Sequence, residues 1–256
     1  MLANIVAGLI TTVLIALGGL LWRHRGHFGL LRATVFPSGR LRVSVAALLR
    51  VKDDDSYVLF HNPIRPHAYG PPGGVVKYRS GARKALDAVG FVDQRRSTGR
   101  VAAMRHDLRG FVPSRSGIDF LRWYSRGDDR ESGPECLRRE LREELAEVGH
   151  PELVPLTENL RFALVRTVLE RPRPTPGKQY STLRSFEVYD AVTDTPEAAE
   201  LVGRLVALGH NPAETQIVLV DASDIEDGRS GAHLISPQSA FLLGNRRIHQ
   251  DLPGLS

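Results

Sequence analysis

Three glutamates spaced along one short stretch, residues 130–145, are the residues best suited to chemistry in this chain: Glu140, Glu143 and Glu144. Positions i, i+3 and i+4 share one face of a helix, so three carboxylates on that face crowd together and repel one another. Mg²⁺ prefers oxygen ligands and would neutralise this repulsion. The spacing therefore predicts a divalent-cation site. The alternative is a solvated helix face with counter-charges from three arginines, Arg138, Arg139 and Arg142.

The same stretch carries the signals of a helix start. Ser132 and Glu135 have the spacing of a capping box, and Pro134 suits the first turn, where a missing N–H costs nothing. Apolar residues then recur at helical spacing and predict one buried stripe, made of Leu137, Leu141, Leu145 and Val148. The single cysteine, Cys136, lies in this helix, and we expect it to have a packing role.

The order of residues resembles a known motif. Glu131, followed after seven residues by REL-REE at 139–144, matches the E-x7-R-E-U-x-E-E core of the Nudix box, G-x5-E-x7-R-E-U-x-E-E-x-G-U. Two glycines of the box are missing locally, because Ala146 and Ser125 stand in their places. In Nudix hydrolases such glutamates bind metal, so the resemblance implies that Glu140, Glu143 and Glu144 hold Mg²⁺ or Mn²⁺. It also implies a catalytic set of Glu131, Arg139, Glu143 and Glu144, in which the arginine orients Glu131.

A glycine-rich turn lies far upstream, in YGPPGGVVKY at 69–78. Paired glycines and prolines suit a turn at which the backbone passes close to another group, although a plain loop explains them too. The turn also resembles the glycine end of a Nudix box. The resemblance then implies that the box is split by an insertion at about 79–130, and that Gly73 and Gly74 contact the substrate.

These features together resemble one subfamily. A strand of R-x-S-x-A type (residues 42–46), the Pro-Gly-Gly turn and the later helix look like the SMODS-associated Nudix proteins, which occur with cyclic-oligonucleotide synthases in bacterial antiphage (CBASS) systems. The resemblance implies an α/β fold, a Nudix-type α/β/α sandwich with a mixed sheet. The triplet Asp107-Leu108-Arg109 also recurs in that subfamily. Asp107 and Arg109 are therefore candidate ligand contacts, although a local ion pair between them explains the triplet equally well.

The N-terminus predicts a membrane anchor. Residues 2–22 are almost continuously apolar and carry no charge, and this is about the length that a bilayer core requires. Basic residues follow at 23–27, so the positive-inside rule predicts a single-pass protein of the inner membrane with its C-terminal domain in the cytoplasm. The alternative is an unusual secretion signal. Residues 23–39 are interpreted as a linker, 40–245 as the Nudix-like domain and 246–256 as a tail.

The remaining pattern predicts elements that suit an α/β domain. Residues 41–51 and 57–61 are expected to form one β-hairpin, and 171–177 a stiff loop that could overhang a site. Helices are expected at 82–88, 118–124 and 195–208; strands at 160–169, 182–192 and 216–220; and an apolar last segment at 235–243.

Composition narrows the range of partners. The chain has 256 residues, a formal net charge of +5 and one cysteine, so no intrachain disulfide is expected. Its basic residues form no run that suits a nucleic-acid groove, and its histidines lack zinc-ligand spacing. No direct nucleic-acid binding is therefore expected.

Two classes of function follow. The first is a membrane-anchored, Mg²⁺-dependent Nudix hydrolase of a nucleoside diphosphate linked to another moiety, acting as an effector in antiphage signalling. The second is a non-catalytic sensor that binds a cyclic oligonucleotide, self-associates and acts on the membrane. A housekeeping membrane Nudix enzyme is a further alternative. The expected partners are a nucleotide or cyclic-oligonucleotide ligand, the lipid bilayer, a cyclic-oligonucleotide synthase and further copies of this chain in a homo-oligomer.

Overall fold

The computed structural model describes residues 39–250, apart from 64, 66 and 95–104. The predicted anchor at 2–22 and all of the predicted linker except residue 39 lie outside the described residues. None of the helices in the described part of the chain is long and apolar enough to cross a bilayer.

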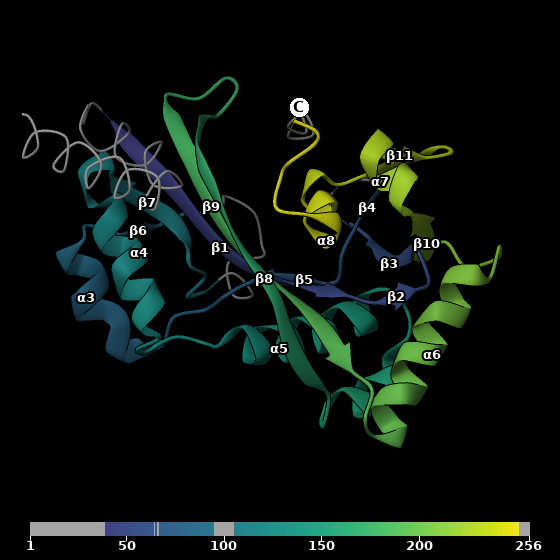
Figure 1. The fold of residues 1–256 in the computed structure, drawn as a ribbon. Coiled ribbons are helices and arrows are strands. Elements are labelled where there is room, and N and C mark those ends of the chain that lie inside the picture. The colour runs from purple at the N-terminus through teal and green to yellow at the C-terminus, as the bar shows by residue number, and fades with distance from the viewer. Residues whose placement is uncertain (1–38, 64, 66, 95–104, 251–256) are drawn as a thin grey trace, which may run out of the picture.

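The first of two mixed sheets is built around β1 (Arg40–Arg50). β1 runs parallel to β9 (Tyr180–Val192) and antiparallel to β7 (Arg109–Pro113) and β5 (Gly73–Val75). β8 (Arg161–Pro174) and β6 (Val92–Asp93) form its edges. The long strands run diagonally through the centre of the molecule (Figure 1).

The second sheet has the order β10-β3-β4-β12-β11, with β2 (Lys52–Asp53) paired to β3 (Ser56–His61). Its other strands are β4 (Ala68–Gly70), β10 (Ile217–Asp221), β11 (Arg229–Ser230) and β12 (His233–Ile235). The predicted hairpin is therefore wrong in its pairing, because β1 and β3 belong to different sheets and only the short β2 turns back onto β3. The mixed α/β architecture that the resemblance implied is present, in the form of two mixed sheets with helices. Alternation of apolar residues identifies strands but not their partners.

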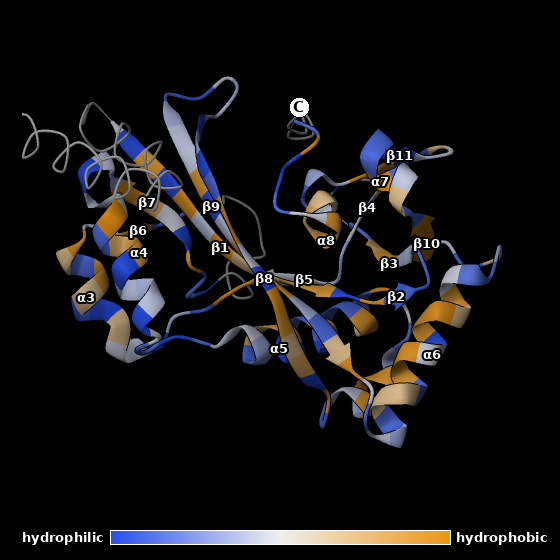
Figure 2. Cartoon of the chain, viewed as in Figure 1, coloured by the Kyte–Doolittle hydropathy of each residue, from blue (hydrophilic) through white to orange (hydrophobic). Residues whose placement is uncertain are grey.

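The apolar core lies on both faces of β1. Val43, Val45 and Ala47 belong to the core cluster that contains the apolar stripe of α5 (Gly133–Glu147). Ala46 and Leu48, on the opposite face, belong to the cluster between the two sheets. Successive side chains of a strand point to opposite faces, so a strand buried on both sides is continuously apolar, as residues 45–49 are. Much of β1 is apolar (Figure 2).

The insertion contributes a small α/β unit at one end of the first sheet. It contains η2 (Ser80–Ala82), α3 (Arg83–Ala88), β6, β7, η3 (Ser114–Ser116) and α4 (Gly117–Arg126). The helix predicted at 118–124 is present as α4, and its Phe120 and Trp123 are buried. Phe91 stacks on Phe120, with ring centroids 5.8 Å apart.

The C-terminal half follows the predicted elements with one correction. η4 (Pro151–Thr157) joins α5 to β8, and α6 (Pro196–His210) begins at the Thr195 cap, as predicted. The stiff loop expected at 171–177 is mostly strand, because β8 continues to Pro174. Prolines are tolerated on an edge strand, where their missing N–H need not pair. The far end of this β8–β9 hairpin is hydrophilic and lies away from α5 (Figure 2).

The last described segment packs against the second sheet and the long hairpin. α7 (Ala222–Asp227) comes first. η5 (Pro237–Ser239) and α8 (Ala240–Leu243) then form most of the apolar segment predicted at 235–243, and Phe241 packs on Phe186. Beyond them, Arg247 forms a two-pronged ion pair with Glu170 of β8. The packed structure therefore continues past residue 245.

Candidate active site

The helix that carries the glutamates, α5, begins as the sequence predicts. Ser132 Oγ accepts a hydrogen bond from the Glu135 N–H at 3.3 Å, and the Glu135 carboxylate accepts one from the Ser132 N–H at 2.7 Å. The predicted capping box is confirmed, and the predicted apolar stripe is buried. Burial of this stripe fixes the rotation of α5 about its axis, so it also fixes where the glutamates point.

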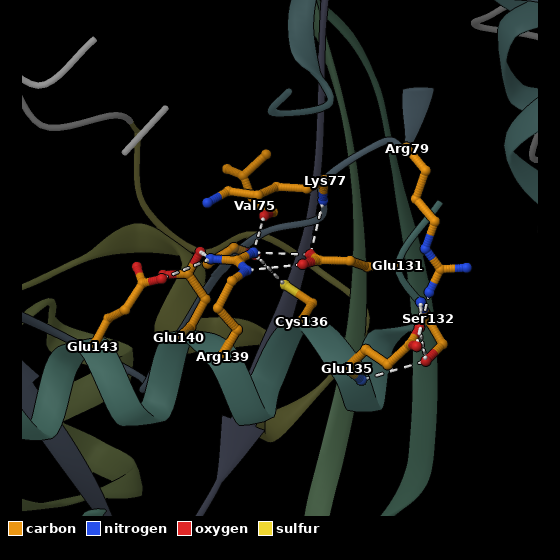
Figure 3. A network of polar contacts seen from close by, with 11 residues as sticks. Val75, Lys77, Arg79, Glu131, Ser132, Glu135, Cys136, Arg139, Glu140 and Glu143 are labelled. Carbon is orange, nitrogen blue, oxygen red and sulfur yellow. Dashed lines mark hydrogen bonds and ion pairs between the residues drawn. The ribbon is translucent and has the colours of Figure 1, made fainter. Parts of the chain in front are cut away.

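Arg139 organises one side of the site. Its Nε and Nη2 donate to the two carboxylate oxygens of Glu131 at 2.8 and 2.9 Å. Nη1 donates to Glu140 at 2.6 Å, and Nη2 also donates to the Val75 carbonyl at 3.0 Å. Figure 3 shows Arg139, Glu140 and Glu143 rising from α5 toward Val75 and Glu131. Arg139 therefore holds Glu131 in one orientation.

The distant glycine turn meets the helix. Gly73 and Gly74 form the start of β5, and the Gly73 N–H donates to the Glu144 carboxylate at 2.9 Å. Gly73 has a φ of 134°, which side chains disfavour, and a Cβ at Gly74 would overlap the Glu140 carboxyl group. Only residues without a side chain allow this approach. The two separated parts of the box therefore come together in space.

Lys77 is a member of the site that the sequence reasoning missed. Its N–H donates to the Glu131 carboxylate at 3.0 Å, and its carbonyl accepts from the Glu131 N–H at 2.8 Å. The charge of Lys77 also lowers the pKa values of Asp107 and Glu140 relative to what burial alone would give. Its position three residues after Gly74 was the signal available in the sequence.

Asp107, a residue of the insertion, lies beside the segment that follows the glycine turn. Asp107 pairs with Lys77 in an isolated antiparallel bridge, and its side chain is buried. Arg109 begins β7 and pairs with Ser44 of β1. Burial raises the pKa of Asp107 to about 6, and the charge of Arg109 opposes this rise.

The glutamates differ in their environments. Burial raises the pKa of Glu140 despite the opposing charge of Arg139. Burial raises the pKa of Glu144 well above its ordinary value, although the hydrogen bond from Gly73 opposes this. The Glu143 side chain is 50% exposed and lies 3.7 Å from Arg139. Among the described residues, no group of three or more His, Cys, Asp or Glu side chains is arranged to hold a metal ion.

The residues nevertheless have the chemistry that Mg²⁺ or Mn²⁺ requires. Glu140 and Glu144 bring half-buried carboxylates against the glycine turn, and Arg139 is already shared between Glu131 and Glu140. Burial makes the charged forms of these carboxylates costly, and a hard cation with oxygen ligands would compensate their charge. Glu140 and Glu144 fit such an ion, and Glu143 is the nearest further carboxylate on the same helix.

A family model, the SMODS-associated NUDIX domain, matches residues 40–243. The chain belongs to this family. The match confirms the resemblance that the split box indicated, and it covers both parts of the box and the insertion between them. No curated protein and no solved structure matches the chain significantly.

In this SMODS-associated NUDIX domain, the remaining helix residues have supporting roles. Cys136 is fully buried, its thiol contacts the Gly74 carbonyl at 3.5 Å, and burial raises its pKa, so the thiol is unreactive. A hollow of about 370 Å³ opens on the solvent side of α5, and its lining residues are Glu135, Arg138, Arg139, Arg142 and Glu143. One surface of α5 is therefore solvated, as the alternative interpretation expected, and another faces the glycine turn. Arg139 and Glu143 take part in both.

Proposed function

We propose that this protein is a Nudix-type hydrolase that acts on a nucleoside diphosphate linked to another moiety. The observation that carries the proposal is the contact of the glycine turn with the box glutamates across an insertion: Gly73 donates to Glu144, and Gly74 lies against Glu140. The contact supports the proposal because it places two half-buried carboxylates of the box beside a main chain that only glycine allows to approach so closely.

The roles of the residues follow from their contacts. Glu140 and Glu144, with Glu143 beside them, would hold Mg²⁺ or Mn²⁺, which supplies charge neutralisation at the diphosphate and a more acidic water. Arg139 fixes the Glu131 carboxylate through two hydrogen bonds, and the Lys77 N–H adds a third. The Lys77 ammonium group and Arg109 provide positive charge for a substrate phosphate.

The test uses the purified full-length protein with Mg²⁺ and a panel of ADP-ribose, NAD⁺, dinucleoside diphosphates and cyclic oligonucleotides. We expect metal-dependent products from a diphosphate-containing compound, and their loss in the Glu143→Gln/Glu144→Gln variant. Glu147→Gln is the matched control, because Glu147 is exposed on the same helix. Circular dichroism checks that each variant is folded.

The alternative function, a sensor without turnover, gives a different result in the same experiment. Its support is the exposure of Glu143 and the alanine at position 146, where the box has glycine. A sensor would yield no product from any compound, would bind a cyclic oligonucleotide and would form larger assemblies in sedimentation.

We also propose that residues 2–22 anchor the protein in the inner membrane, with the Nudix domain in the cytoplasm as an antiphage effector beside a cyclic-oligonucleotide synthase. The support is the uncharged apolar run and the basic residues after it. The protein should stay in the membrane fraction after carbonate washing. A variant that lacks residues 1–25 should be released, and its release would show that these residues are the anchor.

A further inference from the structure

The hollow on the solvent side of α5 is rich in guanidinium groups. Its volume of about 370 Å³ is large enough for a small ligand. The residues that line it have the spacing i, i+3, i+4, i+7 and i+8, so they share one face of the helix: Glu135, Arg138, Arg139, Arg142 and Glu143. Figure 3 shows Glu135, Arg139 and Glu143 at successive turns of α5. Three of the five lining residues are therefore arginines on a single face.

The three arginines of the hollow differ in what they contact. Arg139 binds the carboxylates of Glu131 and Glu140. Arg142 is exposed and makes no hydrogen bond or ion pair with any residue that the structure describes. Arg138 likewise has no ion pair within the described part of the chain. The sequence allowed all three arginines to be counter-charges of the glutamates, but only Arg139 contacts one.

The Arg138 guanidinium group is held in place and still has an unused donor. Its Nη2 donates to the Leu160 carbonyl at 3.0 Å, and the group lies 5.8 Å from the centroid of the Phe162 ring. Its Nε is buried and has no hydrogen-bond partner among the described residues. Buried N–H groups normally have a partner, and an unpaired one costs free energy. A negatively charged acceptor beside this group would recover that cost.

The two glutamates of the hollow are engaged elsewhere. Glu135 accepts a hydrogen bond from the Ser132 N–H and pairs with Arg79 at 2.8 Å. Glu143 lies 3.7 Å from Arg139. Neither carboxylate comes within 4.0 Å of the other two arginines of the hollow. Two positive charges therefore remain beside the hollow without an acidic partner from residues 39–250, the masked positions aside.

We propose that the hollow is a phosphate-binding site, in which Arg138 and Arg142 bind one phosphate group. The two arginines are four positions apart on α5, so their side chains are neighbours and their like charges repel. Guanidinium groups match the geometry of phosphate and can donate two parallel hydrogen bonds to it. A phosphate dianion between them removes the repulsion and gives both groups acceptors.

Two sources can supply this phosphate group. The hollow shares Arg139 and Glu143 with the Nudix box, so a substrate on the box glutamates can extend a further phosphate group into it. The other source is a separate ligand that carries a phosphate group. The first source rests on the proposed function, whereas the binding of phosphate to the hollow does not.

The test measures the binding of inorganic phosphate to the purified full-length protein by calorimetry, in EDTA and at low salt. Wild type should bind phosphate, and Arg142→Gln should weaken the affinity by about tenfold or more, because charge-assisted hydrogen bonds are lost. Arg142 has no described partner to lose, so its replacement should leave the fold intact. The matched control is Arg126→Gln, an equally exposed and unpaired arginine at the end of α4, which should bind phosphate as wild type does.

Arg138→Gln is the second variant and should also weaken phosphate binding. Circular dichroism checks its fold, because it loses the hydrogen bond to Leu160. If it folds poorly, Arg142→Gln alone decides. Absence of phosphate binding in wild type would overturn the proposal, as would equal affinities in wild type and Arg142→Gln.

The source of the phosphate group is distinguished by kinetics with whichever diphosphate compound of the panel is hydrolysed. A higher KM in Arg142→Gln would assign the phosphate group to the substrate. An unchanged KM beside weakened phosphate binding would assign it to a separate ligand. A wild-type protein that binds phosphate in the hollow but hydrolyses nothing would overturn the proposed function and support the phosphate site.

Discussion

Glu131 and Lys77 bind each other in both directions, although they lie 54 positions apart in the sequence. The Glu131 N–H donates to the Lys77 carbonyl, and the Lys77 N–H donates back to the Glu131 carboxylate. One residue of the box is thereby fixed to the segment that carries the glycine turn. The same carboxylate is the one that Arg139 binds. Hydrogen bonds to Glu131 thus connect the two separated parts of the box.

Replacing the Glu131 carboxylate should lower the stability of the domain. Glu131→Gln loses the charge that accepts hydrogen bonds from Arg139 and Lys77, and we expect the free energy of unfolding to fall by about 1.5–3 kcal/mol. Urea denaturation measures it. The same change at Glu200, whose pair with Arg204 is exposed, should cost less than about 0.5 kcal/mol. Equal losses in the two variants would contradict the role given to Glu131.

Gly74 should tolerate no side chain. In Gly74→Ala the new Cβ would displace the Glu140 carboxyl group, so Mn²⁺ affinity, measured by calorimetry, should fall by about tenfold or more. Gly203→Ala is the control, because nothing lies within 4 Å of the new Cβ in α6. It should leave Mn²⁺ affinity unchanged and stabilise the protein by about 0.5–1 kcal/mol. An unchanged affinity in Gly74→Ala would remove Glu140 from the metal site.

The local features of this site could be predicted from sequence, and the long-range ones could not. The capping box and the apolar stripe of α5 depend on residues within a few turns of one another. The resemblance alone implied that the glycine turn and the glutamates belong to one box, since no local pattern joins residues so far apart. Lys77 was missed because its role depends on main-chain bonds to Glu131, which any residue type can make.

In the fold, too, local features were predicted correctly and long-range pairing was not. Strand and helix positions followed the apolar periodicity, but the assignment of β1 and β3 to one hairpin was wrong, because pairing partners are set by packing on both faces of β1. The proline-rich segment at 171–177 looked like a loop, yet most of it continues β8 at the edge of the sheet. Edge strands place few demands on residue type, so their sequence resembles that of loops.

Two helix caps allow stability and activity to be separated. Ser132 and Thr195 each accept a hydrogen bond from a main-chain N–H three residues later, at 3.3 and 3.2 Å. Ser132→Ala and Thr195→Ala should each lower the free energy of unfolding by about 1 kcal/mol. Only Ser132→Ala should also lower kcat, because Ser132 follows Glu131 directly. Equal kcat values in the two variants would show that the cap does not position Glu131.

The stability of the domain should depend on the protonation of His150. Its ring nitrogens lie 2.9 Å from Glu214 and 3.2 Å from Glu152. Burial opposes the charge of His150, but these contacts prevail and raise its pKa above 6.5. A raised pKa in the folded state gives stabilisation that is complete below pH 6.5 and is lost as the pH rises through the folded-state value.

His150→Gln should therefore reduce the difference between the melting temperatures at pH 6 and pH 8.5, as scanning calorimetry would measure. The control is His210→Gln, since the contact of His210 with Asp53 is exposed. Glu214 acts in the opposite direction: burial raises its pKa, but hydrogen bonds from Gln216 and His150 lower it overall. Its contribution is lost only as the pH falls through that lowered value. The same pH dependence in His150→Gln as in wild type would exclude this contact as the cause.

The ion pair between Arg247 and Glu170 should hold the C-terminal segment. Arg247 Nε and Nη2 lie 2.6 and 2.8 Å from the two carboxylate oxygens, and both side chains are nearly inaccessible. Arg247→Ala removes the closer of two cations from this buried carboxylate, since Arg184 lies 3.8 Å from Glu170. The change should cost up to about 3–5 kcal/mol in urea denaturation. Arg246→Ala, at the exposed neighbouring position, should cost less than about 0.5 kcal/mol. Similar losses of unfolding free energy in the two variants would show that the ion pair of Arg247 with Glu170 adds nothing to stability.

The dipeptide Lys77-Tyr78 holds the insertion at two points, since Lys77 pairs with Asp107 and Tyr78 pairs with Arg130. The insertion is therefore divided into two segments whose ends are joined at nearly the same place. The entropy of closing a loop grows only with the logarithm of its length, by about 0.6 kcal/mol for each doubling. Closure entropy thus places little limit on the length of either segment, and surface residues can be added to this part of the chain without moving α5.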